Sequence, residues 1–192
     1  MRHDLAPEGA AFRLRPVTDA DAAFVLALRT DPRLNRWLHP TPPGVERQLA
    51  WLAEYRQRPG DWYFVVEHRS SGRPEGLVGL YDVDPQATRG EWGRWILRHG
   101  SMAAVESAWL IYRVAFDLLG LAEVVCRTVA DNRAVVSFHD SCGLSGRRVL
   151  TGQFELPDGR HDAVEHRLER AGWPGVAARL EALARRLAER IR

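Results

Sequence analysis

The chain has 192 residues, of which 45% are hydrophobic, and its 27 basic side chains other than histidine are all arginines. This length and composition suffice to bury the core of one domain, which excludes a disordered protein, and the absence of lysine excludes any mechanism that needs a lysine amine. The net charge of +2 is uneven, because residues 1–166 hold 20 arginines against 22 acidic groups and residues 167–192 hold seven against three. A nucleic-acid-binding domain normally carries its basic excess on the folded body, so we expect no nucleic-acid partner.

Cysteine usage and the N-terminus indicate the compartment. Cys126 and Cys142 fit neither a zinc-ligand spacing nor a disulfide framework, so we expect reduced thiols. Residues 1–8 have no apolar signal-peptide core, and no apolar run approaches the roughly 20 residues that span a bilayer. We therefore expect a cytoplasmic protein without a membrane partner. Its arginine- and alanine-rich composition is typical of a GC-rich bacterial genome.

The first half of the chain predicts a strand, two helices and a three-stranded meander. Alternating apolar and charged residues predict a strand over Phe12–Arg15. Thr18 or Asp19 then caps a helix, and a second helix runs from about Val45 to Gln57 after a proline-rich segment. Three strand-like runs follow, separated by turn residues: Trp62–Glu67, Gly76–Val83 and Glu91–Leu97.

The second half predicts a crossover and a hairpin. The predicted elements are a helix over Ala103–Leu119, a strand over Val124–Val129, a helix over Asn132–Cys142, hairpin strands over Val149–Leu156 and Asp162–Leu168, and a final helix over Val176–Ile191. Meander strands followed by a strand–helix–strand crossover predict an α+β fold, with a central mixed sheet of about seven strands flanked by helices. We expect one domain over residues 1–170 and an appended amphipathic helix in residues 171–192.

Two local patterns carry a family resemblance. The opening Phe12-Arg13-Leu14-Arg15-Pro16 and the segment from Asn132 to Leu144 (NRAVVSFHDSCGL) are similar to those of the GNAT acetyltransferases, in the branch of ribosomal-protein N-terminal and amino-sugar-nucleotide N-acetyltransferases. The resemblance covers roughly residues 12–168. It implies the GNAT fold and N-acetyl transfer with acetyl-CoA as co-substrate. Asn132 and Gly143 also suit the N-cap and C′ positions of a helix, which explains both residues without a ligand.

The resemblance also places an acyl-CoA loop before the long central helix. The family pattern there is Gln/Arg-x-x-Gly-x-Gly/Ala, whose glycines let backbone N–H groups approach a pyrophosphate at the helix N-terminus. In this chain His99 replaces the arginine or glutamine, and Met102 replaces the central glycine. The cofactor-binding residues implied are Ile96, Leu97, Arg98, His99, Gly100, Ser101, Met102, Ala103, Ala104 and Asn132.

Two residues are candidates for proton transfer. His139 lies seven residues after Asn132, where the family commonly has a tyrosine that protonates the departing thiolate, and histidine has an ordinary pKa of about 6.5. Its alternative role is a half-buried helix residue that only forms hydrogen bonds. Glu91 is the candidate base, because the pleat puts it on one strand face with Gly93 and Trp95. Its alternative role is an edge glutamate paired with Arg89 or Arg94.

The acceptor side is expected to be aromatic and basic. The stretch 33–37 (RLNRW) resembles the helix with which amino-sugar-nucleotide acetyltransferases meet their substrate. The substrate-binding candidates are Arg36, Trp37, His39, Tyr81 and Trp92, although each tryptophan is equally suited to the core. The expected acceptor is a small amine, above all an amino sugar or a nucleotide-linked amino sugar. Acetylation of a protein N-terminus is one alternative, and a non-catalytic GNAT-fold binding protein, motivated by His99 and Met102, is another.

Two further patterns bear on ligands and assembly. His161 and His166 do not share a strand face, so we expect no metal site. In the C-terminal helix, an apolar stripe lies opposite the arginines and consists of Val176, Leu180, Leu183, Leu187 and Ile191. Packing of this stripe onto its own domain is the default, and a homodimer through the helix is the alternative.

Overall fold

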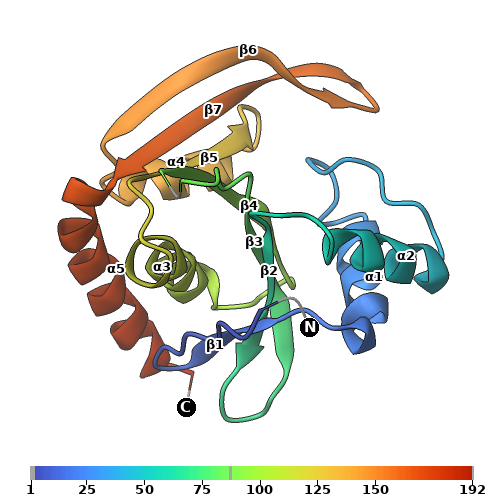
Figure 1. Cartoon of the computed structure of the whole chain (residues 1–192), viewed down its shortest axis with the longest axis horizontal. Helices are drawn as coiled ribbons and strands as arrows, with labels where there is room; N and C mark the ends of the chain where they lie inside the picture. Colours follow the sequence, from blue (N-terminus) through green and yellow to red (C-terminus); the bar gives the residue numbers. More distant parts are fainter. Residues whose placement is uncertain (1–2, 87, 192) are drawn as a thin grey trace.

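A seven-stranded mixed sheet in the order β1-β2-β3-β4-β5-β7-β6 organises the computed structural model, which describes residues 3–86 and 88–191 (Figure 1). The strands are β1 (Phe12–Pro16), β2 (Trp62–His68), β3 (Pro74–Tyr81), β4 (Arg89–Leu97), β5 (Glu123–Val129), β6 (Gly146–Leu156) and β7 (Gly159–Glu169). The helices are α1 (Ala22–Thr30), α2 (Val45–Tyr55), α3 (Ala104–Arg113), α4 (Arg133–Ser141) and α5 (Trp173–Ala188). β4 and β5 run parallel and the other neighbours antiparallel, which confirms the predicted α+β fold.

Helices cover both faces of the sheet, and the sequence of β2 shows why. Phe64 and Val66 lie in the core that α3 and α5 cover, whereas Tyr63 and Val65 lie in the core under α1 and α2. Successive side chains of a strand point to opposite faces, so a continuous apolar run marks a strand buried on both sides. Figure 1 shows α3 and α5 on one side of β2–β4 and α1 and α2 on the other.

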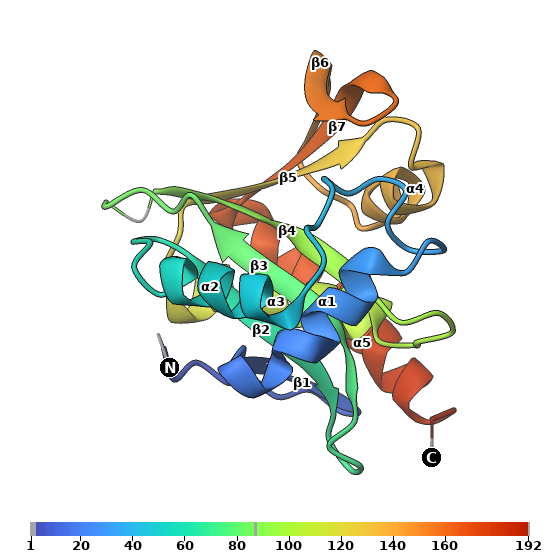
Figure 2. The same ribbon diagram turned by 90° about the vertical axis from the view of Figure 1, so that its right-hand side faces the viewer.

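β4 and β5 separate after a short paired stretch. Their register is Arg89↔Glu123, Gly90↔Val124 and Glu91↔Val125, and the residues that follow in β4 have no partner in β5 among the residues described. Figure 2 shows the two strands diverging beyond this end. The β3–β4 register shifts near Leu77, and Arg94 has a φ of 50°, so a bulge bends β4 as it leaves β5. The divergence opens the sheet at its centre.

The C-terminal helix α5 packs on the domain itself. Val176, Leu180 and Trp173 are buried in the same core as α3, and the indole Nε1 of Trp173 donates a hydrogen bond to Asp117 Oδ1 at 2.7 Å. The helix begins at Trp173, earlier than predicted, because Pro174 occupies the first turn, where a missing N–H costs nothing. Most of the apolar stripe is therefore occupied within the chain, and residues 171–192 share the core of the domain.

Two searches of the described residues concern membranes and metals. None of the described helices is long and apolar enough to cross a bilayer. Over residues 3–86 and 88–191, no three or more His, Cys, Asp or Glu side chains gather in a group that could hold a metal ion.

Candidate functional site

A cavity of about 720 Å³ opens where β4 and β5 diverge. Its inner part is lined by residues 91–95 of β4, residues 126–129 of β5, and Asn132, Val135 and His139 from α4 and its N-cap. Its outer part is lined by α1, α2, the segment 37–42 and Phe154 of β6. This volume lies within the range of small-molecule sites, which is roughly 300–1,000 Å³. The cavity therefore has room for ligands that enter from both sides of the sheet.

The outer wall forms where two distant segments meet. The ring centroid of Trp37 lies 6.0 Å from that of His161 in β7, and the ring of His39 lies 6.3 Å from that of Phe154 in β6. Figure 1 shows the β6–β7 hairpin extending over the same side of the molecule. The predicted candidates Trp37 and His39 thus line the cavity, whereas Arg36 is not a lining residue and lies over the Trp37 ring, 4.5 Å from its centroid.

Glu91 lies at the point where the strands part. Its carboxylate accepts a hydrogen bond from the Tyr81 hydroxyl at 3.0 Å and pairs with the Arg127 guanidinium at 2.5 Å. Burial to 9% exposure raises the pKa of Glu91, and the charge of Arg127 opposes that rise. Arg89 and Arg94, the partners considered from the sequence, bind Glu123 and Asp61 instead. A carboxylate with a raised pKa, facing a cavity, is suited to accept a proton near neutral pH.

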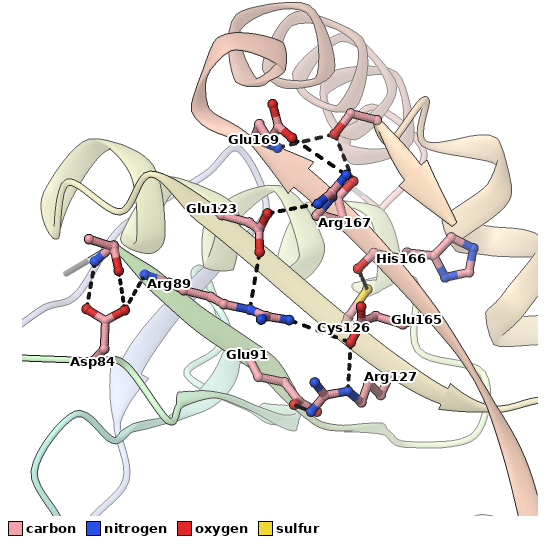
Figure 3. Close-up of polar contacts among 12 residues, drawn as sticks. Asp84, Arg89, Glu91, Glu123, Cys126, Arg127, Glu165, His166, Arg167 and Glu169 are labelled. Atoms are coloured by element: carbon pink, nitrogen blue, oxygen red, sulfur yellow. Dashed lines mark hydrogen bonds and ion pairs between the residues drawn. The ribbon is translucent and has the colours of Figure 1, made fainter. Parts of the chain in front are cut away.

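Arg127 connects Glu91 to a second carboxylate. Its Nε lies 2.9 Å from Glu165 Oε2 in β7, and Arg148 of β6 donates to Glu165 Oε1 at 2.7 Å. Burial of Glu165 raises its pKa, but the hydrogen bonds from Arg148 and Arg127 outweigh burial and hold that pKa below its usual value. Figure 3 shows Glu91, Arg127 and Glu165 following one another across β4, β5 and β7. This chain fixes the position of the Glu91 carboxylate.

His139 lines the cavity from α4, but its protonation state differs from the one expected. The side chain is 2% exposed, and the centroids of the Trp92 and His166 rings each lie 5.2 Å from the centroid of its imidazole. Burial lowers the pKa of His139 to about 3, and His166 lowers it further. The imidazole is therefore neutral at neutral pH. It cannot deliver a proton as an imidazolium there, so the predicted role as general acid does not suit the free protein.

We expect NMR titration to separate His139 from His161. The pKa of His161 is raised above 6.5 by its hydrogen bond to Asp158, so its Cε1–H resonance should shift with a midpoint above pH 6.5. The His139 resonance should stay at its neutral position from pH 8 down to pH 5, because its pKa is about 3. Spectra of His139→Gln and His161→Asn assign the two signals. A His139 midpoint between pH 5.5 and 7.5 would contradict the neutral state.

Tyr81 and Trp92 differ from the substrate-facing surface that the sequence predicted. Burial raises the pKa of Tyr81, so its hydroxyl remains protonated and donates to Glu91, while the Arg94 guanidinium lies 4.4 Å from the ring centroid. Trp92 is 1% exposed and lies in the core against Trp95 and Tyr112. A fully buried ring offers no face to a sugar, so Trp92 is a core residue at the inner end of the cavity.

The predicted acyl-CoA loop lies outside the cavity. Of the residues assigned to cofactor binding, Asn132 lines it, whereas residues 96–104, all of which the structure describes, do not. Ile96 and Leu97 end β4 and pack into the two cores.

The loop itself runs from Arg98 to Ala103 and leads directly into α3. Gly100 has a φ of +78°, which favours glycine, and Ser101 Oγ accepts the N–H of Ala103 at 3.3 Å. Met102 is 41% exposed, so its side chain lies largely in solvent. His99 is exposed too, and the loop thus presents the N-terminus of α3 to solvent, where unpaired N–H groups and the helix dipole favour an anion.

Sequence analysis did not single out Arg127, although one signal for it exists. An arginine interrupts the otherwise apolar run of β5, and the pleat puts Arg127 on the same face as Val125, the residue opposite Glu91. Arg29 and Arg47, on α1 and α2, also line the cavity without having been predicted. Their contribution depends on how the two helices are placed against the sheet.

Comparison with known proteins gives the family. A model of the acetyltransferase (GNAT) domain matches residues 12–145, and the chain belongs to this family of acetyltransferases. Family membership implies the use of acetyl-CoA. No curated protein matches the chain.

Solved structures resemble this chain over nearly its whole length. An acetyltransferase from T. thermophilus, titled without a substrate, is 28% identical, with a TM-score of 0.79 over 94% of this chain and 97% of that one. FdhC, described as a nucleotide-linked sugar GNAT, is 25% identical, with a TM-score of 0.74 over 90% and 94%. A chimera of the Vibrio cholerae spermidine N-acetyltransferase and hSSAT, 17% identical over 85% and 98% with a TM-score of 0.76, shares the fold alone. The predicted GNAT fold and acetyltransferase class are confirmed.

Proposed function

We propose that this enzyme transfers an acetyl group from acetyl-CoA to the primary amine of a small acceptor by direct attack. The acceptor that we favour is an amino sugar, in particular a nucleotide-linked one. The observation that carries the proposal is the place of Glu91, a buried carboxylate in the cavity at the point where β4 and β5 diverge.

The residues on the donor side suit acetyl-CoA. Beyond Glu91 the backbone of β4 has no strand partner on the β5 side among the described residues, so its polar groups can hydrogen-bond an extended arm. Arg98 and His99 stand beside the loop that leads into α3, where they would face the anionic end of the donor. Asn132 lies on the cavity wall between the donor side and α4. When bound, acetyl-CoA supplies the thioester carbonyl.

Glu91 makes the acceptor nucleophilic. It takes one proton from the ammonium group, directly or through a water molecule, and leaves a neutral amine. The amine nitrogen then forms the new C–N bond as the thioester C–S bond breaks, and the second proton of the nitrogen passes to the sulfur. The neutral His139 ring can hydrogen-bond within the cavity but is not the proton source. Holding the two reactants in line is the remaining contribution of the protein.

Two observations support a small sugar-like acceptor. The Trp37–His161 and His39–Phe154 contacts close the outer wall, which suits a small molecule better than an extended peptide. The similarity to the nucleotide-linked sugar enzyme extends over 90% of this chain. Acetylation of a protein N-terminus would need an open groove at this wall.

Thiol release in the presence of acetyl-CoA tests the proposal. We expect free CoA to appear only when an amine is added, and fastest with a nucleotide-linked amino sugar such as UDP-glucosamine. Glucosamine and a short peptide with a free N-terminus are the comparison acceptors. A higher kcat/KM for the peptide would point to protein acetylation. Calorimetry that detects acetyl-CoA binding, combined with no turnover on any amine, would leave only a binding protein.

A further inference from the structure

The charges that line the cavity are unbalanced. Its wall carries four arginines but two glutamates: Arg29, Arg47, Arg94 and Arg127 against Glu54 and Glu91. Two of the arginines are neutralised by carboxylates. Arg94 binds both oxygens of Asp61, at 2.7 and 2.8 Å, and Arg127 lies between Glu91 and Glu165.

The remaining two arginines lie on the outer, acceptor side. Arg29 donates to Thr41 Oγ1 at 2.8 Å and to the carbonyl of His39 at 3.4 Å, which holds its guanidinium against the segment 39–41 of the cavity wall. Arg47 is exposed on α2 and lines the same wall. Neither arginine forms an ion pair with any residue in the ranges 3–86 and 88–191. Glu54 does not compensate them, because it pairs with Arg58 at 3.7 Å.

The aromatic rings of this wall already hold cations. The Arg94 guanidinium lies 5.5 Å from the Trp51 ring centroid, and Arg58 lies 5.3 Å from the same ring. Arg36 lies 4.5 Å from the Trp37 centroid. Ring faces of this kind attract ammonium groups. Here the guanidinium groups of the protein lie over them, so the wall offers a polyamine little attraction and two uncompensated positive charges.

We propose that Arg29 and Arg47 bind a phosphate group of the acceptor and thereby select amines that carry such a group over neutral amines and polyamines. A guanidinium can donate two parallel hydrogen bonds to phosphate, and two of them on one wall can hold a phosphate or diphosphate. The assignment rests on the proposed function for the fate of the amine, but the phosphate contact itself requires no turnover. Arg29 and Arg47 are therefore specificity determinants and take no part in the bond exchange.

Calorimetry on the protein saturated with CoA tests this contact, because CoA occupies its own phosphate-binding groups. The probes are UDP and glucosamine 1-phosphate, with glucosamine and spermidine as ligands that lack phosphate. We expect both phosphate ligands to bind, and Arg29→Gln and Arg47→Gln each to weaken that binding by about tenfold or more. Arg186→Gln on α5 removes the same charge far from the cavity and should leave binding unchanged. Thermal unfolding checks that each variant is folded.

The outcomes separate the phosphate source and the two proposals. Binding of both phosphate ligands, or of UDP alone, supports the inference, and the second result assigns the phosphate to a nucleotide. Absence of binding by both ligands, binding that neither variant weakens, or spermidine binding of equal strength overturns it. Absence of acetyl transfer to every amine, with phosphate binding retained and sensitive to both variants, overturns the proposed function and leaves the phosphate site standing.

Discussion

Glu91→Gln is expected to lower kcat by about two to four orders of magnitude, the usual contribution of a positioned general base. The amide keeps the size of the carboxylate and an oxygen that can accept the hydrogen bond from Tyr81, but it cannot take the proton of the ammonium group. The KM for acetyl-CoA should change little, because Glu91 acts on the acceptor. Initial rates of thiol release at saturating concentrations of both substrates measure the loss.

The pH profile identifies the group that is lost. Because burial raises the pKa of Glu91, the wild-type rate should increase with pH through a value above the ordinary glutamate pKa, as the carboxylate becomes free to accept a proton. Glu91→Gln should lack this acidic limb. Glu46→Gln, the same substitution on an exposed carboxylate of α2, should retain both rate and limb. An unchanged limb in Glu91→Gln would assign the base to another residue.

The local sequence determined most of the fold. The apolar run of β2 indicates a strand covered on both faces, and the helix and strand order of the second half indicates the crossover that makes β4 and β5 parallel. The ends of some elements were less accessible. β6 begins at Gly146, three residues earlier than predicted, because pairing with β7 extends the ladder through exposed polar residues such as Arg147 and Arg148 that carry no apolar signal.

The candidate site was predictable only where one element decides it. Glu91 follows from the pleat of its own strand. The state of His139 does not, because its low pKa depends on Trp92 from β4 and His166 from β7, which the fold brings against α4. The contact between Arg127 and Glu91 likewise depends on the β4–β5 register, which joins residues 36 positions apart. No local pattern specifies such a register.

Arg127→Met should therefore affect both stability and chemistry. It removes the guanidinium that Glu91 and Glu165 share, and these carboxylates are only 9% and 3% exposed. Loss of one partner of a buried ion pair costs about 3–5 kcal/mol. Glu91 keeps Tyr81 and Glu165 keeps Arg148, so we expect a smaller loss, of about 2–3 kcal/mol, in the free energy of unfolding. Urea denaturation measures it.

The effect on chemistry distinguishes Arg127 from a purely structural residue. The charge of Arg127 holds down the pKa of Glu91, so its removal should move the acidic limb of the rate to higher pH and leave the rate at the alkaline plateau largely intact. Arg148→Met is the matched control, because it removes a partner of Glu165 without touching Glu91 and should leave the limb in place. Arg127→Lys, which restores the charge, should move the limb back toward the wild-type position. If Arg127→Met and Arg148→Met lose stability but share the wild-type limb, Arg127 only holds the strands together, and the burial of Glu91 alone sets its pKa.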